Sequence, residues 1–220
     1  MGKSEEFWNK SADNYDRTEE RFEKIHQASR EYAKKHLKDS DIVLDYGCGT
    51  GTTACELANH VSEIEGIDIS GRMIELSKEK AVANGVENVS FAQADIFDEG
   101  FSKSSFDVIL AFNMLHTVPD PQRVMGRVHE LLKPDGTFVS VTPCLRDKMS
   151  FVVSAQIQLV RLLCKLGIIP VPIRRLQSSD LDRLVGGANF HAMETRKIYS
   201  GASSYFIAAK KRRMNDSFVR

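Results

Sequence analysis

One acid and three glycines lie close together in the first quarter of the chain. Asp45 is followed by Gly47, Gly49 and Gly51 at every second position. Glycine allows backbone angles that are closed to other residues, and it lets a ligand approach the main chain without meeting a Cβ. A carboxylate beside such a turn attracts a positively charged group and repels a phosphate. The spacing therefore predicts a turn that binds a cationic small molecule.

The phosphate-binding turn of a dinucleotide fold is the main alternative for this stretch. Its pattern, Gly-x-Gly-x-x-Gly, would require glycine at position 52, where the chain has Thr52. The observed Asp-x-Gly-x-Gly-x-Gly instead resembles the first motif of the class I S-adenosylmethionine-dependent methyltransferases. S-adenosyl-L-methionine carries an ammonium and a sulfonium and no phosphate. The resemblance implies that it is the cofactor and that it is bound by Asp45 and by the turn, with Cys48 between the first two glycines.

A second acid, Asp68, ends the strand predicted over residues 63–70. A carboxylate at the tip of that strand can accept two hydrogen bonds from the vicinal hydroxyls of a ribose. Nicotinamide and adenosylmethionine sites both use this arrangement, so Asp68 indicates a nucleoside without choosing between them. The family likeness places Ile69 and Met73 near the adenine. Core packing alone would also require apolar residues there.

The strand predicted over residues 89–94 leads into a stretch that is similar to the family's adenine-binding motif. This resemblance implies that Asp95 binds the adenine amino group and that Ile96 lies along the ring. An aspartate after a strand is also ordinary turn chemistry. Phe112, at the end of the apolar strand predicted over residues 106–112, completes the expected cofactor-binding residues.

The N-terminal residues 1–37 are predicted to form a helical lead-in of two helices, with a break near residues 11–15. Trp8 and Tyr15 lie there in a stretch that resembles the Trp-x-x-x-Ala-x-x-Tyr-Asp lead-in of many small-molecule methyltransferases. The resemblance implies that Tyr15 closes over the methionine end of the cofactor. The alternative is that both rings only hold the helix against the domain.

The residues after the strand 106–112 bear on the acceptor. Methyltransferases that act on DNA amino groups or on protein glutamine carry Asn/Asp-Pro-Pro-Tyr/Phe there, whereas this chain has Asn-Met-Leu-His at 113–116. The segment resembles the Leu-His stretch of quinone-biosynthesis and related small-molecule enzymes, which implies a small, apolar or aromatic acceptor methylated at oxygen, carbon or nitrogen. His116 is the candidate catalytic base for a hydroxyl acceptor. A structural histidine that shapes the wall is the commoner alternative.

Together these elements predict an α/β fold: a Rossmann-like three-layer sandwich whose seven-stranded, mostly parallel sheet has an antiparallel final strand. The core covers residues 38–144 and 177–210, and a basic tail follows at 211–220. The C-terminal half is expected to contain a helix at 121–132, a turn at 133–136, a strand at 137–142, a helix at 178–185 begun by Ser178 or Ser179 and ended by Gly186 and Gly187, and a hairpin of 190–199 with 204–209.

Residues 145–176 interrupt the regular pattern with a helix that is apolar around much of its girth and ends at Gly167. Gln156, Arg161 and Lys165 interrupt it too often for a membrane span. We expect a helical cap inserted over the strand tips. A dimer face and simple core packing are the alternatives.

Composition restricts the remaining possibilities. The 220 residues suit one domain, and 30 basic residues balance 30 acidic ones, so no global charge draws the chain to nucleic acid or to an anionic membrane. Four scattered cysteines lack metal-ligand spacing and no signal peptide is present, which predicts a cytoplasmic monomer or homodimer without a bound metal. A nicotinamide-dependent oxidoreductase and a non-catalytic nucleoside-binding regulatory subunit are the alternative functions.

Overall fold

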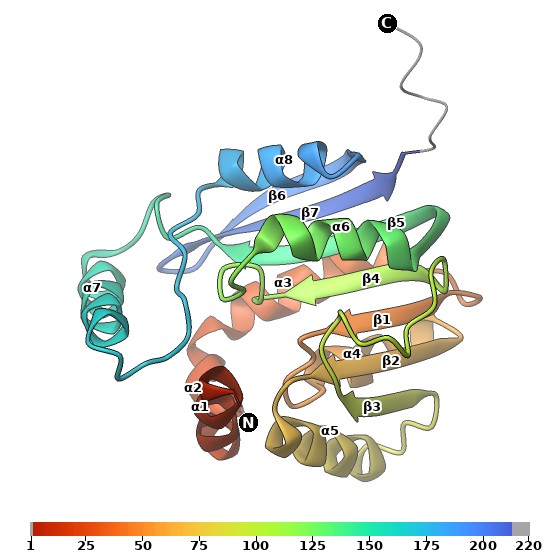
Figure 1. Ribbon diagram of the computed structural model, residues 1–220, viewed down its shortest axis with the longest axis horizontal. Helices are drawn as coiled ribbons and strands as arrows, with labels where there is room; N and C mark the ends of the chain where they lie inside the picture. Colours follow the sequence, from red (N-terminus) through yellow and green to blue (C-terminus); the bar gives the residue numbers. More distant parts are fainter. Residues whose placement is uncertain (1, 213–220) are drawn as a thin grey trace, which may run out of the picture.

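A seven-stranded sheet runs through the computed structural model, which describes residues 2–212 (Figure 1). The strands lie in the order β3-β2-β1-β4-β5-β7-β6. Their bounds are β1 Ile42–Tyr46, β2 Glu63–Asp68, β3 Val89–Gln93, β4 Phe106–Phe112, β5 Leu132–Pro143, β6 Phe190–Tyr199 and β7 Ser203–Lys211.

The first five strands in this order pair in parallel, and β7 runs antiparallel to both β5 and β6. This confirms the expected fold class, including the antiparallel final strand. The chain crosses over between β1 and β4, where the strand order reverses direction. In such sheets the crevice for a ligand opens at the carboxyl ends of the strands at this point.

Helices cover both faces of the sheet and create two buried clusters. One cluster packs α6 and α8 against the sheet, and the other packs α3, α4 and α5 against its opposite face. The helices are α1 Lys3–Ser11, α2 Tyr15–Glu19, α3 Glu23–Lys34, α4 Thr52–Leu57, α5 Gly71–Ala83, α6 Pro121–Leu131, α7 Phe151–Lys165 and α8 Ser178–Gly187.

The N-terminal lead-in has three helices where the sequence predicts two. A 3-10 turn at Ala12–Asn14 confirms the expected break, and a second one at Glu20–Phe22 separates α2 from α3. No helix-breaking residue marks the second turn. This second 3-10 turn lets α3 bury Ile25 and Ala33 while α2 stays at the carboxyl ends of the strands.

The expectation of a turn at 133–136 is wrong, because these residues belong to β5. Leu132 pairs with Phe106, and the register then shifts before Val108 pairs with Thr137. Asp135 takes a positive φ of 62° inside this irregularity. A bulge in a continuous strand therefore replaces the separate turn.

Two details at the C-terminal end of the chain also differ from expectation. Gln177, and neither Ser178 nor Ser179, is the N-cap of α8, and its main-chain N–H donates to Asp180 Oδ2 at 3.0 Å. Gly186 and Gly187 are the last residues of the helix instead of lying beyond it. Lys211, expected in the tail, belongs to β7, whereas residues 213–220 of that tail lie outside the described part of the chain.

Residues 145–176 contain the predicted helix, α7, and Gly167 follows it with a positive φ of 72°. Figure 1 shows α7 at one edge of the molecule, beside the sheet. None of its residues is buried, so the core-packing interpretation is wrong. Across residues 2–212, no helix combines the length and apolar character that crossing a bilayer requires.

Candidate functional site

The loop after β1 is shaped by its three glycines. All three have a positive φ, between 54° and 77°. The main-chain N–H groups of Gly47 and Cys48 both donate to the carbonyl of Ile67, at 2.8 and 3.0 Å, which places the loop against the end of β2. A Cβ on Gly51 would lie 2.7 Å from the Cβ of Ser77. The third glycine is therefore required for helix packing as well as for its backbone angles.

Asp45 lies beneath this loop and is only 1% exposed. Its Oδ2 has no hydrogen-bond partner among the described residues. Burial, with repulsion from Asp68 added, raises the pKa of the Asp45 carboxyl to about 7. A buried carboxylate without a partner costs free energy. The position therefore suits a ligand that brings positive charge to this carboxylate.

Asp68 joins the glycine loop to the start of α5. Its Oδ2 accepts from the N–H of Gly49 at 3.1 Å, and its Oδ1 accepts from the N–H of Ser70 at 2.9 Å. Burial raises the pKa of this carboxyl, and the two backbone N–H groups oppose the rise. Carboxylate oxygens have further lone pairs, so Asp68 can still accept from a ligand hydroxyl.

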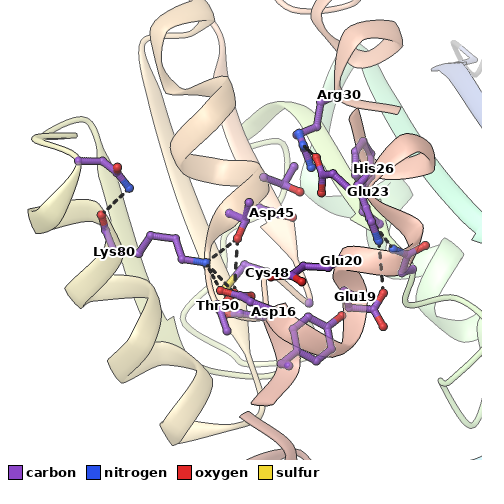
Figure 2. A pocket seen from close by; sticks show the side chains of 18 residues that line it. Asp16, Glu19, Glu20, Glu23, His26, Arg30, Asp45, Cys48, Thr50 and Lys80 are labelled. Carbon is purple, nitrogen blue, oxygen red and sulfur yellow. Dashed lines mark hydrogen bonds and ion pairs between the residues drawn. The ribbon is translucent and has the colours of Figure 1, made fainter. Parts of the chain in front are cut away.

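A cavity of about 390 Å³ opens between the glycine loop, the end of β4 and the helices α2, α3, α4 and α5 (Figure 2). Six of the predicted site residues line it: Tyr15, Asp45, Gly47, Cys48, Gly49 and Phe112. The other predicted residues are not part of its lining: Gly51, Asp68, Ile69, Met73, Asp95, Ile96 and His116.

The residues predicted around the adenine lie to the side of this cavity. Ile69 is half-buried, Met73 is buried, and Ile96 is fully buried in the core. Asp95 is exposed, and its Oδ1 accepts from the N–H of Phe97 at 2.9 Å, as in an aspartate turn. The structure therefore does not bring all of the predicted residues to a single cavity.

Tyr15 covers the glycine loop. A Cβ built on Gly49 would lie 3.6 Å from the Tyr15 ring, and Trp8 packs edge-on against that ring with centroids 6.4 Å apart. Burial and the nearby acids, Glu19 first among them, raise the pKa of the Tyr15 hydroxyl. It is therefore protonated at neutral pH and can donate a hydrogen bond. Both suggested roles, covering the site and holding the helix, are compatible with this placement.

Carboxylates outnumber free cations around the cavity. Lys80 Nζ lies 2.7 Å from Asp16 Oδ2 and also donates to Thr50, and Arg30 pairs with Glu23 at 2.6 Å. Figure 2 shows these pairs on opposite sides of Asp45. The remaining acids on the lining are Glu19, Glu20 and Asp45. This excess of negative charge favours a cationic ligand.

Sequence reasoning missed His26, which lines the cavity from α3. Its Nε2 lies 3.3 Å from Glu19 Oε2, and its Nδ1 lies 3.3 Å from Asn113 Nδ2 at the end of β4. Asn113 has a positive φ of 55°, which is uncommon outside glycine and marks a constrained position. His26 and Asn113 are 87 residues apart, so no local pattern could have connected them.

Sequence reasoning also missed Asn9 on α1. Its Oδ1 accepts from Ser70 Oγ at 2.7 Å and from the N–H of Arg72 at 3.2 Å. Because Asp68 binds the N–H of Ser70, this contact attaches the N-terminal helix to the edge where a ribose is expected.

His116, the predicted base, has a buried Nδ1 without a hydrogen-bond partner in the described structure. Burial lowers the pKa of this imidazole to about 4, although Glu19 opposes the shift. His116 is therefore neutral at pH 7 and only weakly basic. Its carbonyl accepts from the N–H of Arg174 at 2.8 Å, which connects this loop to residues 145–176.

A family model for a methyltransferase domain matches residues 37–192. The chain belongs to this methyltransferase family. The match confirms the resemblance to class I S-adenosylmethionine-dependent methyltransferases, with S-adenosyl-L-methionine as the cofactor. It decides against the nicotinamide alternative. The buried Asp45 oxygen, which has no hydrogen-bond partner among the described residues, fits such a cationic ligand.

Named relatives match the methyltransferase core only in part. An uncharacterized methyltransferase YcgJ from Bacillus subtilis is 36% identical over 45% of this chain and 39% of its own length. A ubiquinone biosynthesis O-methyltransferase from Haemophilus ducreyi is 33% identical over 52% of this chain and 51% of its own. The chain thus spans about half or less of the length of these curated relatives. Their names agree with the quinone-biosynthesis-like branch expected from the sequence.

Solved structures of other methyltransferases share the fold. The YcgJ crystal structure superposes with a TM-score of 0.68 at 20% identity, covering 86% of this chain and 100% of that one. A geranyl diphosphate C-methyltransferase from Streptomyces coelicolor, in complex with S-adenosyl-L-homocysteine, gives 0.68 at 15% identity, covering 86% and 80%. These likenesses confirm the Rossmann-like architecture.

Proposed function

We propose that this methyltransferase binds S-adenosyl-L-methionine over the glycine loop and methylates a small, apolar or aromatic acceptor beside the end of β4. The observation that carries the proposal is the buried Asp45 oxygen, which has no hydrogen-bond partner within residues 2–212 and lies next to a cavity rich in acids. A positively charged cofactor would supply the missing partner. No group of three or more potential metal ligands gathers among residues 2–212.

Each predicted residue has a proposed role at the cofactor. Asp45 and the main chain of Gly47, Cys48 and Gly49 hold the methionine end, and Tyr15 covers it. Asp68 accepts from the ribose hydroxyls. On the adenine side lie the apolar residues Ile69, Met73 and Ile96 and the acid Asp95. The cofactor itself supplies an activated methyl group, so the protein needs mainly to orient the acceptor and to exclude water.

Two observations support a small acceptor. The apolar Phe112 lines the cavity at the end of β4. The names of the relatives in ubiquinone and menaquinone biosynthesis point the same way, since such acceptors are aromatic. Oxygen is the favoured acceptor atom, because a histidine faces the cavity.

For a hydroxyl acceptor we propose His26 as the base, with Glu19 as its positioning residue. Glu19 lies 3.3 Å from one ring nitrogen of His26 and stabilises the charge that the ring gains with a proton. Asn113 Nδ2 lies 3.3 Å from the other ring nitrogen, Nδ1, and the acceptor hydroxyl would replace it there, because a base needs a free lone pair. His116 is less suited because burial lowers its pKa to about 4 and it does not line the cavity.

Titration calorimetry with S-adenosylhomocysteine and with NAD tests the cofactor site. We expect binding of the first and none of the second, and we expect Asp45→Asn to weaken it. Asp98→Asn is the matched control, because Asp98 is an exposed acid in a loop away from the cavity. Equal affinity of the two variants would contradict the role of Asp45.

A methyl-transfer assay over a panel of catechols, hydroquinones, amines and carbon acids tests the acceptor. With a hydroxyl acceptor we expect His26→Gln to lower kcat by about 10²–10⁴-fold. Affinity for S-adenosylhomocysteine should not change. The matched variant His116→Gln should retain most of the activity. The reverse pattern would return the catalytic role to His116, and full activity of both would mean that orientation alone suffices.

A further inference from the structure

Several large apolar side chains of α7 are exposed to solvent. Phe151 is 88% exposed and Leu162 is 52% exposed, and Val152, Leu159 and Leu166 are exposed as well. Large apolar side chains of a globular domain are normally buried, so a group of them on one helix indicates a contact with something outside the chain.

The exposed residues form one continuous stripe. At an advance of about 100° per residue, Phe151, Ala155, Leu159, Leu162 and Leu166 fall within an arc of about 80°, and Val152 widens it to about 100°. This arc contains no charged side chain within residues 151–166. The half-buried residues Val153, Ile157 and Val160 lie on the opposite side of the helix. The helix is therefore amphipathic with its most exposed face apolar.

The segment that carries α7 is also strongly basic. Residues 145–176 contain six arginines and lysines and one acid, Asp147, although the whole chain is neutral. Arg161 and Lys165 lie on the helix just beside the stripe. Within the described structure, only Arg146 of these six bases meets a carboxylate, Asp180 at 3.8 Å. Arg174 and Arg175 donate to main-chain carbonyls and Lys148 lies over the Tyr199 ring, which leaves Arg161 and Lys165 on α7 to meet an anionic surface.

We propose that α7 docks the enzyme on the surface of an anionic lipid bilayer. The stripe would enter the boundary between headgroups and acyl chains, while the bases beside it face lipid phosphates. A second copy of this chain is a poorer partner, because a symmetric contact would bring the same basic segment against itself. The helix α7 also lies at the edge of the molecule, where a fluid bilayer can contact it without a matching groove (Figure 1).

The basic segment is attached to the acceptor side of the site. Arg174 donates its N–H to the carbonyl of His116 at 2.8 Å and its Nε–H to the carbonyl of Val118 at 3.1 Å. Ser4 on α1 donates to the carbonyl of Pro170 at 3.3 Å. If the acceptor is apolar, which rests on the function proposed above, docking would place the site near a store of apolar molecules.

Co-sedimentation with vesicles tests the docking. We expect the full chain to bind vesicles of phosphatidylcholine mixed with phosphatidylglycerol, and to bind phosphatidylcholine alone at least about tenfold more weakly. The double variant Leu159→Glu and Leu162→Glu should lose at least about tenfold in partitioning. Val82→Glu is the matched control, since Val82 is an 83% exposed apolar residue on α5. The control should bind as the parent chain does.

Several results would overturn the proposal: no binding to anionic vesicles, equal binding to both vesicle types, or equal loss in the Val82→Glu control. Sedimentation equilibrium could also overturn it. If the parent chain forms a dimer and the α7 double variant does not, the stripe contacts a second copy of the chain. Calorimetry with S-adenosylhomocysteine separates docking from the proposed function. We expect the double variant to bind it with unchanged affinity, and a parallel loss would mean that the substitutions damage the fold.

Discussion

In most folded domains charged groups face water and apolar side chains are buried. The glycine loop and α7 depart from this distribution in opposite ways. At the loop, a charged group, Asp45, is buried without a hydrogen-bond partner in the described chain. On α7, large apolar side chains such as Leu162 are exposed to solvent. Each arrangement costs stability in the free protein, since polar groups prefer water and apolar groups avoid it. The comparison teaches that such departures can mark where the molecule meets a partner, a cationic cofactor in one case and a lipid surface in the other.

The largest expected effect tests how rigidly the loop is built. Gly51→Val should lower the free energy of unfolding by about 3–5 kcal/mol, because valine is strained at the positive φ and its Cβ would overlap Ser77. Urea denaturation measures the loss. Gly126→Ala on α6 is the control, since nothing lies within 4 Å of the added methyl group, and we expect a gain of about 0.5–1 kcal/mol. A Gly51→Val protein as stable as the parent would show that the loop can move.

The second prediction concerns the cost of burying Asp45. Burial raises its pKa from 3.8 to about 7, so the folded protein holds a proton on this group that the unfolded chain has already lost. Stability is therefore favoured at low pH and falls as the pH rises from about 4 to about 7. Relative to Asp45→Asn, the parent chain should lose about 2–4 kcal/mol across this window.

Urea denaturation of both proteins at a series of pH values measures this difference. Saturating S-adenosylhomocysteine should reduce it, because the ammonium of the ligand stabilises the ionised carboxylate. If the free energies of unfolding of the two proteins varied with pH in parallel, burying the Asp45 carboxylate would have no measurable cost. The contrast with α7 would then disappear.

A smaller effect is expected at Asp68. Asp68→Ala should weaken binding of S-adenosylhomocysteine by about 1–3 kcal/mol, because a charged hydrogen-bond acceptor for the ribose is lost. Asp98→Ala is the control. Asp98 accepts a hydrogen bond from the N–H of Gly100 at 2.8 Å in an exposed turn, so this substitution removes a similar backbone contact away from the site. Calorimetry compares the two affinities. Unchanged binding in Asp68→Ala would place the ribose elsewhere.

The smallest effect is expected on α7. Leu162→Ala should change the free energy of unfolding by less than about 0.5 kcal/mol, because the side chain is already exposed to water. Leu110→Ala, in the fully buried part of β4, should cost about 2–5 kcal/mol. Urea denaturation in the absence of lipid compares them. A large loss in Leu162→Ala would reveal a packing role that the exposure of α7 does not suggest.

Much of the cofactor side was predictable from local sequence. The glycine turn, the acid before it and the acid after the second strand follow one another within 24 residues, and each has a chemical reason. The strands β4 and β6 begin and end where their apolar patterns predict. Sequence was weaker where a local signal competed with strand pairing. Pro134 and Gly136 indicate a turn, but the flanking residues Leu132 and Thr137 both pair with β4, so the stretch between them is an irregularity within β5.

The acceptor side was less predictable because its parts come from distant segments. His116 stood out in the sequence since it follows a strand end, yet burial leaves it weakly basic. His26 has no distinguishing pattern on α3, and it becomes a candidate only because α2 and α3 pack against the end of β4. No inspection of neighbours along the chain could connect those positions.

The amino-acid sequence by itself determined the family, the cofactor and the mostly parallel sheet with its antiparallel final strand, because a glycine turn, strand periodicity and acids at strand ends are encoded within short stretches. Only the tertiary structure decided which acid lacks a partner, which histidine faces the cavity and which side of α7 remains in water. Burial and pairing depend on segments that approach one another only when the chain folds. Those properties set the energies of the charged and apolar groups on which the proposed chemistry and docking rest.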